Sequence, residues 1–198
     1  MQLREKAHLM TGSEINRTIV HLAHEIVDKT EAIESLALIG IRRRGVPLAE
    51  RLAKKIQQLT SSQIPVGTLD IQLYRDDLSA MREKPIVHPS QIPFSIGGKD
   101  VILVDDVLYT GRTTRAALDA LFDHGRPLRV RLCVLIDRGH RELPIEASFV
   151  GKRVATDRTE SIEVQLRETD EVEKVLLLEQ TSPAAGPRTP ARSKGASG

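Results

Sequence analysis

Aromatic residues are scarce in this chain: tryptophan is absent, and Phe and Tyr together make up only 3% of the 198 residues. The core must therefore be aliphatic, and no wall of stacking aromatic rings is available for reading nucleic-acid bases. Long apolar runs are missing as well. We therefore expect neither a membrane-spanning helix nor a secretory signal in the first ten residues, MQLREKAHLM.

Cysteine is nearly absent too, since the chain contains one, Cys133. It lies in the apolar run VRLCVLI, which predicts a buried structural thiol rather than a reactive one. A single cysteine permits no internal disulfide, which agrees with a reducing compartment. We expect a cytoplasmic protein.

A strong excess of one charge is also missing, because the formal net charge is only +2. The last 18 residues, rich in Pro, Gly, Ser and Ala, hold three of the 29 basic residues and none of the 27 acidic ones, so the remainder is near −1. The chain is therefore no general polyanion binder, and any nucleic-acid contact needs a local patch or the tail. We expect one domain over residues 1–180 and a disordered tail over 181–198.

What the chain does have is an alternation of helical and strand patterns. The expected helices cover 13–30, 46–59 and 113–124, and the expected strands cover 35–41, 66–74, 101–104, 130–136, 161–166 and 172–179. Strands separated by helices predict parallel pairing with right-handed crossovers. The predicted fold class is α/β, an open sheet covered on both faces. Ligands of such sheets bind beyond the carboxyl ends of the strands, so the loops after Ile41, Val104 and Ile136 are the candidate site.

The loop after Val104 carries the strongest signal. The residues TGRTT, 110–114, stand where a strand turns into a helix, and glycine, threonine hydroxyls and free N–H groups there form a phosphate cradle. Asp105 and Asp106 cannot hold the same phosphate because like charges repel. They can accept hydrogen bonds from two neighbouring hydroxyls, so the pattern predicts a site for a ribose 5-phosphate. The alternative is a capped helix that acidic residues happen to precede.

Two common nucleotide motifs are absent. A Walker-type loop needs Gly-Lys-Ser/Thr, and TGRTT has no lysine. A dinucleotide loop needs G-x-G-x-x-G, which the chain does not contain. No His/Cys group has zinc spacing, so we expect no protein-ligated metal, and Mg²⁺ would arrive with the substrate phosphates.

Three further loops belong to the same predicted edge. GIRRRG, 40–45, suits a second anion such as pyrophosphate, although a solvated run of charge is the alternative. DRGHRELP, 137–144, could cover a base and places Arg138 near a leaving phosphate or a substrate carbonyl; the alternative is an exposed polar turn. LYRDDL, 73–78, leads into a proline-punctuated segment that we expect to move over the site.

The sequence VILVDDVLYTGRT resembles the phosphoribosyl pyrophosphate signature of type I phosphoribosyltransferases. LYRDDL, RGHRELPI and VGK, with their spacing, are similar to one subfamily, the bifunctional pyrimidine-operon attenuation regulators and uracil phosphoribosyltransferases. The resemblance covers about residues 11–180. It implies the type I phosphoribosyltransferase fold: a twisted, mainly parallel sheet, a small hood, which we place around 138–160, and a flexible loop.

The resemblance also implies a reaction, in which uracil and phosphoribosyl pyrophosphate give UMP and pyrophosphate. The transition state is expected to be oxocarbenium-like, so catalysis would rest on positioning and on stabilising the departing pyrophosphate. Asp105, Asp106 and Arg138 are the implied catalytic residues, and Arg42, Arg43 and Arg75 would bind pyrophosphate. The implied donor site consists of Asp105, Asp106, Val107, Leu108, Tyr109, Thr110, Gly111, Arg112, Thr113 and Thr114.

The subfamily also binds leader mRNA of the pyrimidine operon when UMP or UTP is present, and it implies a homo-oligomer, a dimer or larger. Residues that could form a basic RNA surface are Arg17, His21, Lys29, Arg141 and Lys152, interrupted by Asp28, Glu142 and Glu146. Three alternatives remain open: a nucleotide sensor with little catalysis, a salvage enzyme for uracil or another base without RNA regulation, and a transferase for a purine base.

Overall fold

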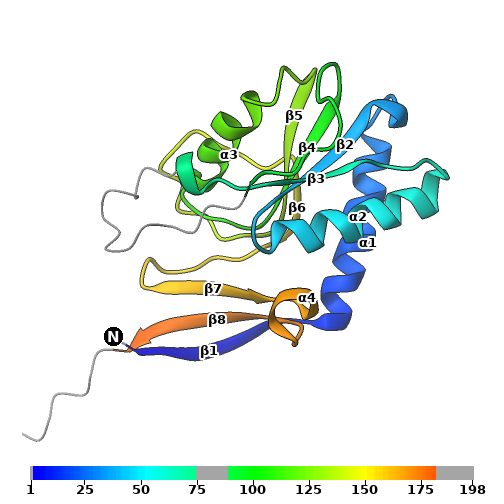
Figure 1. Ribbon diagram of the computed structural model, residues 1–198. Helices are drawn as coiled ribbons and strands as arrows, with labels where there is room; N and C mark the ends of the chain where they lie inside the picture. The colour runs from blue at the N-terminus through cyan, green and yellow to red at the C-terminus, as the bar shows by residue number, and fades with distance from the viewer. Residues whose placement is uncertain (1, 75–88, 182–198) are drawn as a thin grey trace, which may run out of the picture.

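The computed structural model describes residues 2–74 and 89–181, which form two sheets with helices between and around them (Figure 1). In chain order the elements are β1 (Gln2–Thr11), α1 (Gly12–Asp28), η1 (Ile33–Ser35), β2 (Leu36–Ile41), α2 (Gly45–Thr60), β3 (Val66–Leu69), η2 (Gln72–Tyr74), β4 (Asp100–Leu108), α3 (Arg112–Phe122), β5 (Arg129–Asp137), β6 (Phe149–Arg153), β7 (Glu160–Gln165), α4 (Arg167–Asp170) and β8 (Lys174–Thr181). The expected moving loop, with Arg75, and the expected tail beyond residue 181 lie outside these ranges. Thr181, predicted to open the tail, instead ends β8.

The larger sheet confirms the predicted parallel α/β architecture. Its strand order is β3-β2-β4-β5-β6, and each neighbouring pair is parallel. After β2 the chain adds β3 on one side and then returns to add β4 on the other. The order therefore reverses between β2 and β4, and a crevice opens there at the carboxyl edge of the sheet.

The predicted helix layers on both faces are confirmed as well. Along β4 the side chains alternate: Ile102 and Val104 pack in the cluster that contains α1 and α2, whereas Val101 and Leu103 pack with the alanines of α3. Figure 1 shows α1 and α2 on one side of the sheet and α3 on the other. The core is aliphatic, as expected, and Cys133 is buried in it, where burial raises the pKa of its thiol to about 12.

The second, smaller sheet is antiparallel and has the order β1-β8-β7. The sequence placed the small hood around 138–160, but that segment supplies β6 to the large sheet, while the separate sheet comes from both ends of the described chain. β1 was not predicted, because its side chains are mostly exposed and only Met10 is buried. Pairing with the apolar β8, rather than an apolar pattern of its own, makes it a strand.

Helix α1 connects the two sheets and starts where β1 ends. The Thr11 hydroxyl accepts from the Glu14 N–H, and the Glu14 carboxylate accepts from the Thr11 N–H, which forms a capping box. The predicted apolar face of the helix, including Ile15, Ile19 and Ile26, is fully buried. Among the described residues, no helix combines the length and the apolar character that crossing a membrane requires.

Candidate functional site

A pocket of about 440 Å³ lies at the carboxyl edge of the sheet, at the crevice between β2 and β4. Four segments from different parts of the chain form it: the loop after β2, the residues after β3, the end of β4 and the start of α3. Its lining consists of Arg42, Arg43, Arg44, Asp70, Ile71, Gln72, Asp105, Asp106, Val107 and Thr113. The structure therefore brings the predicted diacid and the predicted arginine loop to one cavity.

The two aspartates lie within β4 rather than after it, because the strand continues to Leu108 instead of ending at Val104. Each carboxylate accepts from the N–H of the next residue: Asp105 from Asp106, and Asp106 from Val107, both at 2.9 Å. These local bonds fix both side chains at the pocket wall. The sequence pattern predicted an end at Val104 because the apolar run stops at the two aspartates.

Burial dominates the electrostatics of this pair. Asp105 is 8% exposed, and burial together with the neighbouring charge of Asp106 raises the pKa of its carboxyl well above the ordinary value. Burial also raises the pKa of Asp106, although the hydrogen bond with Asp105 and the charge of Arg44 act in the opposite direction. A ligand that offers two hydroxyl donors would satisfy these acceptors without adding like charge.

The arginine loop reaches the diacid because two glycines let its backbone come close. A Cβ on Gly45 would lie 2.2 Å from the Val104 carbonyl oxygen, and one on Gly40 would lie 2.5 Å from the Val46 Cα. Helix α2 thus begins directly beside β4. The peptide bond between Arg42 and Arg43 is cis.

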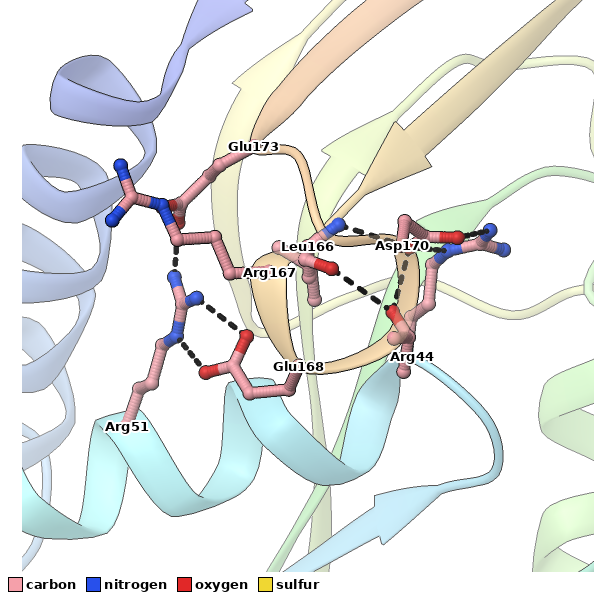
Figure 2. Close-up of polar contacts among 8 residues, drawn as sticks. Arg44, Arg51, Leu166, Arg167, Glu168, Asp170 and Glu173 are labelled. Carbon is pink, nitrogen blue, oxygen red and sulfur yellow. Dashed lines mark hydrogen bonds and ion pairs between the residues drawn. The ribbon is translucent and has the colours of Figure 1, made fainter.

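The three arginines of the loop have different partners. Within the described ranges neither Arg42 nor Arg43 forms an ion pair, and the buried Nε of Arg42 has no hydrogen-bond partner there. Arg44, in contrast, donates through Nε and a terminal nitrogen to both oxygens of Asp170, at 3.0 and 2.7 Å (Figure 2). Arg42 and Arg43, which were predicted to bind pyrophosphate, thus line the pocket without an ion pair in the described ranges, while Arg44 is held by Asp170 of α4.

The loop that was predicted to hold a phosphate leads directly into α3. Gly111 adopts φ +92°, a left-handed conformation that favours glycine, and it immediately precedes α3. The first N–H groups of a helix have no partner within the helix, so this turn presents donors to an anion. Thr113 lines the pocket and Thr114 is buried.

Residues 137–145 support that loop from behind. Glu142 and Leu143 donate their N–H groups to the Thr110 carbonyl, at 2.9 and 3.2 Å. The Arg141 guanidinium donates to the carbonyls of Leu108 and Tyr109 and to the Asp137 carboxylate. Arg141 was predicted to face RNA, but its side chain is turned inward, because backbone carbonyls at the end of β4 and the carboxylate attract the guanidinium.

Arg138, a predicted catalytic residue, is also turned away from the pocket. It is 6% exposed, stacks on the Tyr109 ring at 4.0 Å, and donates to the Thr156 hydroxyl and the Glu160 carbonyl. The guanidinium fills the space between the loop and the start of β7 and satisfies carbonyls that would otherwise lack donors. Its position in the described structure indicates a packing role.

The remaining residues of the predicted RNA surface fall on and beside α1. Arg17 and Lys152 line one shallow hollow of about 250 Å³ together with the acidic Glu14. His21 is exposed on the same helix. Lys29, near the other end of the helix, pairs with Glu25 at 2.6 Å.

Sequence reasoning missed the contribution of the segment after β3. Asp70 is buried, accepts from the Gln72 N–H at 2.9 Å, and lines the pocket with Ile71. The alternating pattern of VGTLDIQLY was interpreted as one strand, whereas β3 ends at Leu69. The signal for a loop at this edge of the site would have been Asp70, a charged residue directly after the short run VGTL.

A larger groove, about 1010 Å³, lies elsewhere, between the start of α1, α2 and α4. Its arginines are already paired: Arg51 bonds Glu168 and Glu173, and Arg167 bonds Glu173 (Figure 2). We assign the chemistry to the smaller pocket because only there do buried carboxylates lie opposite unpaired arginines in the described chain.

Comparison with known proteins identifies the family. The phosphoribosyl transferase domain profile matches residues 9–168. The bifunctional protein PyrR of Pelotomaculum thermopropionicum is 54% identical over 176 residues, which cover 89% of this chain and 97% of that protein. The bifunctional protein PyrR of Thermus thermophilus is 53% identical over 178 residues, 90% of this chain and 98% of that protein.

Solved structures support the fold. A hypoxanthine-guanine phosphoribosyltransferase from Bacillus anthracis aligns with a TM-score of 0.67 and 18% identity over 90% of this chain and 100% of that one. A hypoxanthine phosphoribosyltransferase from Trypanosoma cruzi aligns with a TM-score of 0.68 and 20% identity over 88% and 96%. At such identity the likeness concerns the fold and not the base. The chain belongs to the phosphoribosyl transferase domain family and, within it, to the family of bifunctional PyrR proteins.

Proposed function

We propose that this chain is a uracil phosphoribosyltransferase that also regulates a pyrimidine operon by binding its leader mRNA. One observation supports the transferase activity above all: the pocket joins the buried Asp105 and the half-buried Asp106 to Arg42 and Arg43, which have no ion pair in the described ranges, and to the start of α3. That arrangement offers acceptors for a diol and two sets of donors for anions. Phosphoribosyl pyrophosphate carries a diol between two anionic groups.

Each segment has a role in the proposed reaction. Asp105 and Asp106 accept hydrogen bonds from the ribose hydroxyls, and the turn at Gly111–Thr114 donates to the 5-phosphate. Arg42 and Arg43 bind the pyrophosphate, whose negative charge grows as the anomeric bond breaks. The site thus stabilises the leaving group and orients uracil toward the anomeric carbon, which are the contributions that such a transfer needs.

Magnesium is the implied cofactor, and we propose that it enters with the donor. Among residues 2–74 and 89–181 no group of three or more His, Cys, Asp or Glu side chains could hold a metal ion alone. Mg²⁺ keeps several of its waters and takes substrate phosphate oxygens as ligands, so the donor can carry the ion into the pocket. The ion would supply charge neutralisation at the pyrophosphate, while Asp105 and Asp106 remain acceptors for the ribose hydroxyls.

The first test is turnover. The wild type should convert uracil and phosphoribosyl pyrophosphate to UMP faster than it converts hypoxanthine or adenine. We expect Asp105→Asn with Asp106→Asn to lower kcat/KM by at least about 100-fold, the order that removal of positioning and electrostatic groups costs, while circular dichroism stays unchanged. Near-normal turnover in this variant would disprove the diol assignment, and a preference for hypoxanthine would instead support the purine alternative.

The regulatory activity is proposed from the family and from the surface near α1. The hollow lined by Arg17 and Lys152, with His21 on the same helix, offers donors to single-stranded RNA. The salvage alternative predicts turnover without any UMP- or UTP-dependent shift of the operon leader. The sensor alternative predicts that shift without turnover. We place the protein in the cytoplasm, as a dimer or larger homo-oligomer.

A further inference from the structure

Arg44 lies between two alternative sets of carboxylate partners, the pair in the pocket and Asp170 on α4. It is the residue that directly precedes α2, and it lines the pocket with Asp105 and Asp106. Its positive charge is close enough to act on the pKa of Asp106. Yet the described side chain bonds neither of these two acids; it forms its paired contact with Asp170, outside the pocket (Figure 2).

Asp170 is built to hold this guanidinium. One of its oxygens accepts from the Leu166 N–H at 3.0 Å and from the Thr169 hydroxyl at 2.6 Å, in addition to Arg44. Arg44 and these donors lower the pKa of the Asp170 carboxyl far below its ordinary value, although burial opposes them, so the residue is ionised at neutral pH. Leu166 is fully buried, so the turn that carries Asp170 is fixed to the core.

The charges in the pocket make this hold necessary. Buried carboxylates without a cationic partner are costly, and a flexible arginine beside them would gain free energy by pairing with them. The two acids would then have their acceptor oxygens occupied. Ribose hydroxyls are neutral donors and compete poorly with a guanidinium for the same oxygens.

We propose that Asp170 is a positioning residue for the donor site: it keeps the Arg44 guanidinium at α4 and so leaves Asp105 and Asp106 free for the ribose hydroxyls. This inference rests on the proposed function of the pocket. It assigns an effect on donor affinity to α4, which lines no part of the pocket itself and reaches the lining through Arg44.

A neighbouring pair provides a matched control. Arg51 on α2 donates to both oxygens of Glu168 on α4, each at 2.7 Å, so it joins the same two elements in the same geometry (Figure 2). Neither Arg51 nor Glu168 lines the diacid pocket. Breaking this pair therefore removes an arginine–carboxylate contact to α4 without releasing a cation beside Asp105 and Asp106.

The test measures the Kd of phosphoribosyl pyrophosphate with Mg²⁺ by calorimetry, and kcat with uracil, on the same preparations. For Asp170→Asn we expect a Kd about tenfold weaker, which corresponds to about 1.4 kcal/mol, and a kcat at saturating donor within about threefold of the wild type. Glu168→Gln also breaks an ion pair to α4, and it should leave the Kd of the donor unchanged.

The decisive variant is Arg44→Gln combined with Asp170→Asn. If the released arginine occupies the diacid, the double variant binds the donor more tightly than Asp170→Asn alone, because the Arg44 guanidinium is no longer there to compete. A double variant that binds as weakly as the single one, or a Glu168→Gln variant with the same loss, would overturn the inference. Wild type that binds the donor without making UMP would overturn only the proposed reaction, and wild type that binds no donor would overturn both.

Discussion

At the scale of single residues, the burial of Asp105 lowers the free energy of unfolding. Asp105 is buried beside a second carboxylate, and burial is the main cause of its raised pKa. Because the folded state holds that proton more tightly than the unfolded chain, stability falls as the pH rises from the unfolded pKa toward the folded one. Above this range the ionised carboxylate is a net cost to the fold.

Replacing this charge should therefore stabilise the protein. We expect Asp105→Asn to raise the Tm at neutral pH by about 2–4 °C, the shift that about 1 kcal/mol produces in a chain of this size. The gain should shrink as the pH falls from the raised folded pKa toward the unfolded one, and it should be absent below about pH 4, where Asp105 is protonated in the folded and unfolded states alike. Thermal scans across pH check this, with the exposed Glu50→Gln as a control; a gain that is independent of pH would show that the charge is not the cause.

The same scale shows where sequence reasoning succeeds and fails. Asp105 and Asp106 could be assigned to a site because acids that follow a buried apolar strand must face a ligand or each other. Arg138 and Arg141 lie in an equally polar loop. The sequence does not predict that both guanidinium groups turn inward toward backbone carbonyls. Side-chain direction in a loop depends on distant backbone, here that of residues 108–109 and 156–160.

At the scale of elements, the loop after β5 acts on the loop after β4. Arg141 captures the carbonyl oxygens of Leu108 and Tyr109 from behind. Carbonyls held on that side cannot turn toward an anion, so the N–H groups of the turn stay free for the 5-phosphate that we propose binds there. The family sequence RGHRELP is thus linked to donor binding through the backbone.

We predict that Arg141→Gln weakens donor binding by about three- to tenfold, because about one kcal/mol of loop support is lost. Its effect on RNA binding should be no larger than that of a distant surface change. Donor titration and an RNA gel shift on the same variant separate these roles. An unchanged donor Kd with lost RNA binding would restore the original prediction that this side chain faces RNA.

Element boundaries were predicted with uneven success for physical reasons. The helices α1, α2 and α3 and the strands β2, β5, β7 and β8 have strong patterns and were predicted to within two residues at each end. β1 and β6 were not predicted. A strand with as little buried surface as β1 is specified by its partner β8 rather than by its own residues. The reversal of strand order between β2 and β4 likewise depends on long-range pairing.

At the scale of the whole molecule, charge is arranged locally and not as a global excess. Arg17 and Lys152 are 135 residues apart in the sequence and meet at one hollow, while the groove along α2 has its arginines paired. RNA binding through a few such contacts should depend on salt concentration, and the slope of that dependence should correspond to a small number of released counterions.

We expect the logarithm of leader-RNA affinity to fall linearly with the logarithm of salt concentration, by about 0.7 for each phosphate contacted. Arg17→Gln should reduce that slope by about this amount, whereas Lys54→Gln on α2 should leave it unchanged. Filter binding with UMP present, at several salt concentrations, measures both. A flat salt response in the wild type would contradict a basic RNA surface.

The pairing of β1 with β8 has a consequence for how the molecule comes apart. Gln2 lies opposite Thr181, so the beginning and the end of the described chain close the small sheet together. Detachment of the amino-terminal ten residues would make β8, now the middle strand, an exposed edge strand that is rich in leucine. Trimming or extending one terminus therefore tests the integrity of the other, and aggregation through the exposed strand is the expected penalty.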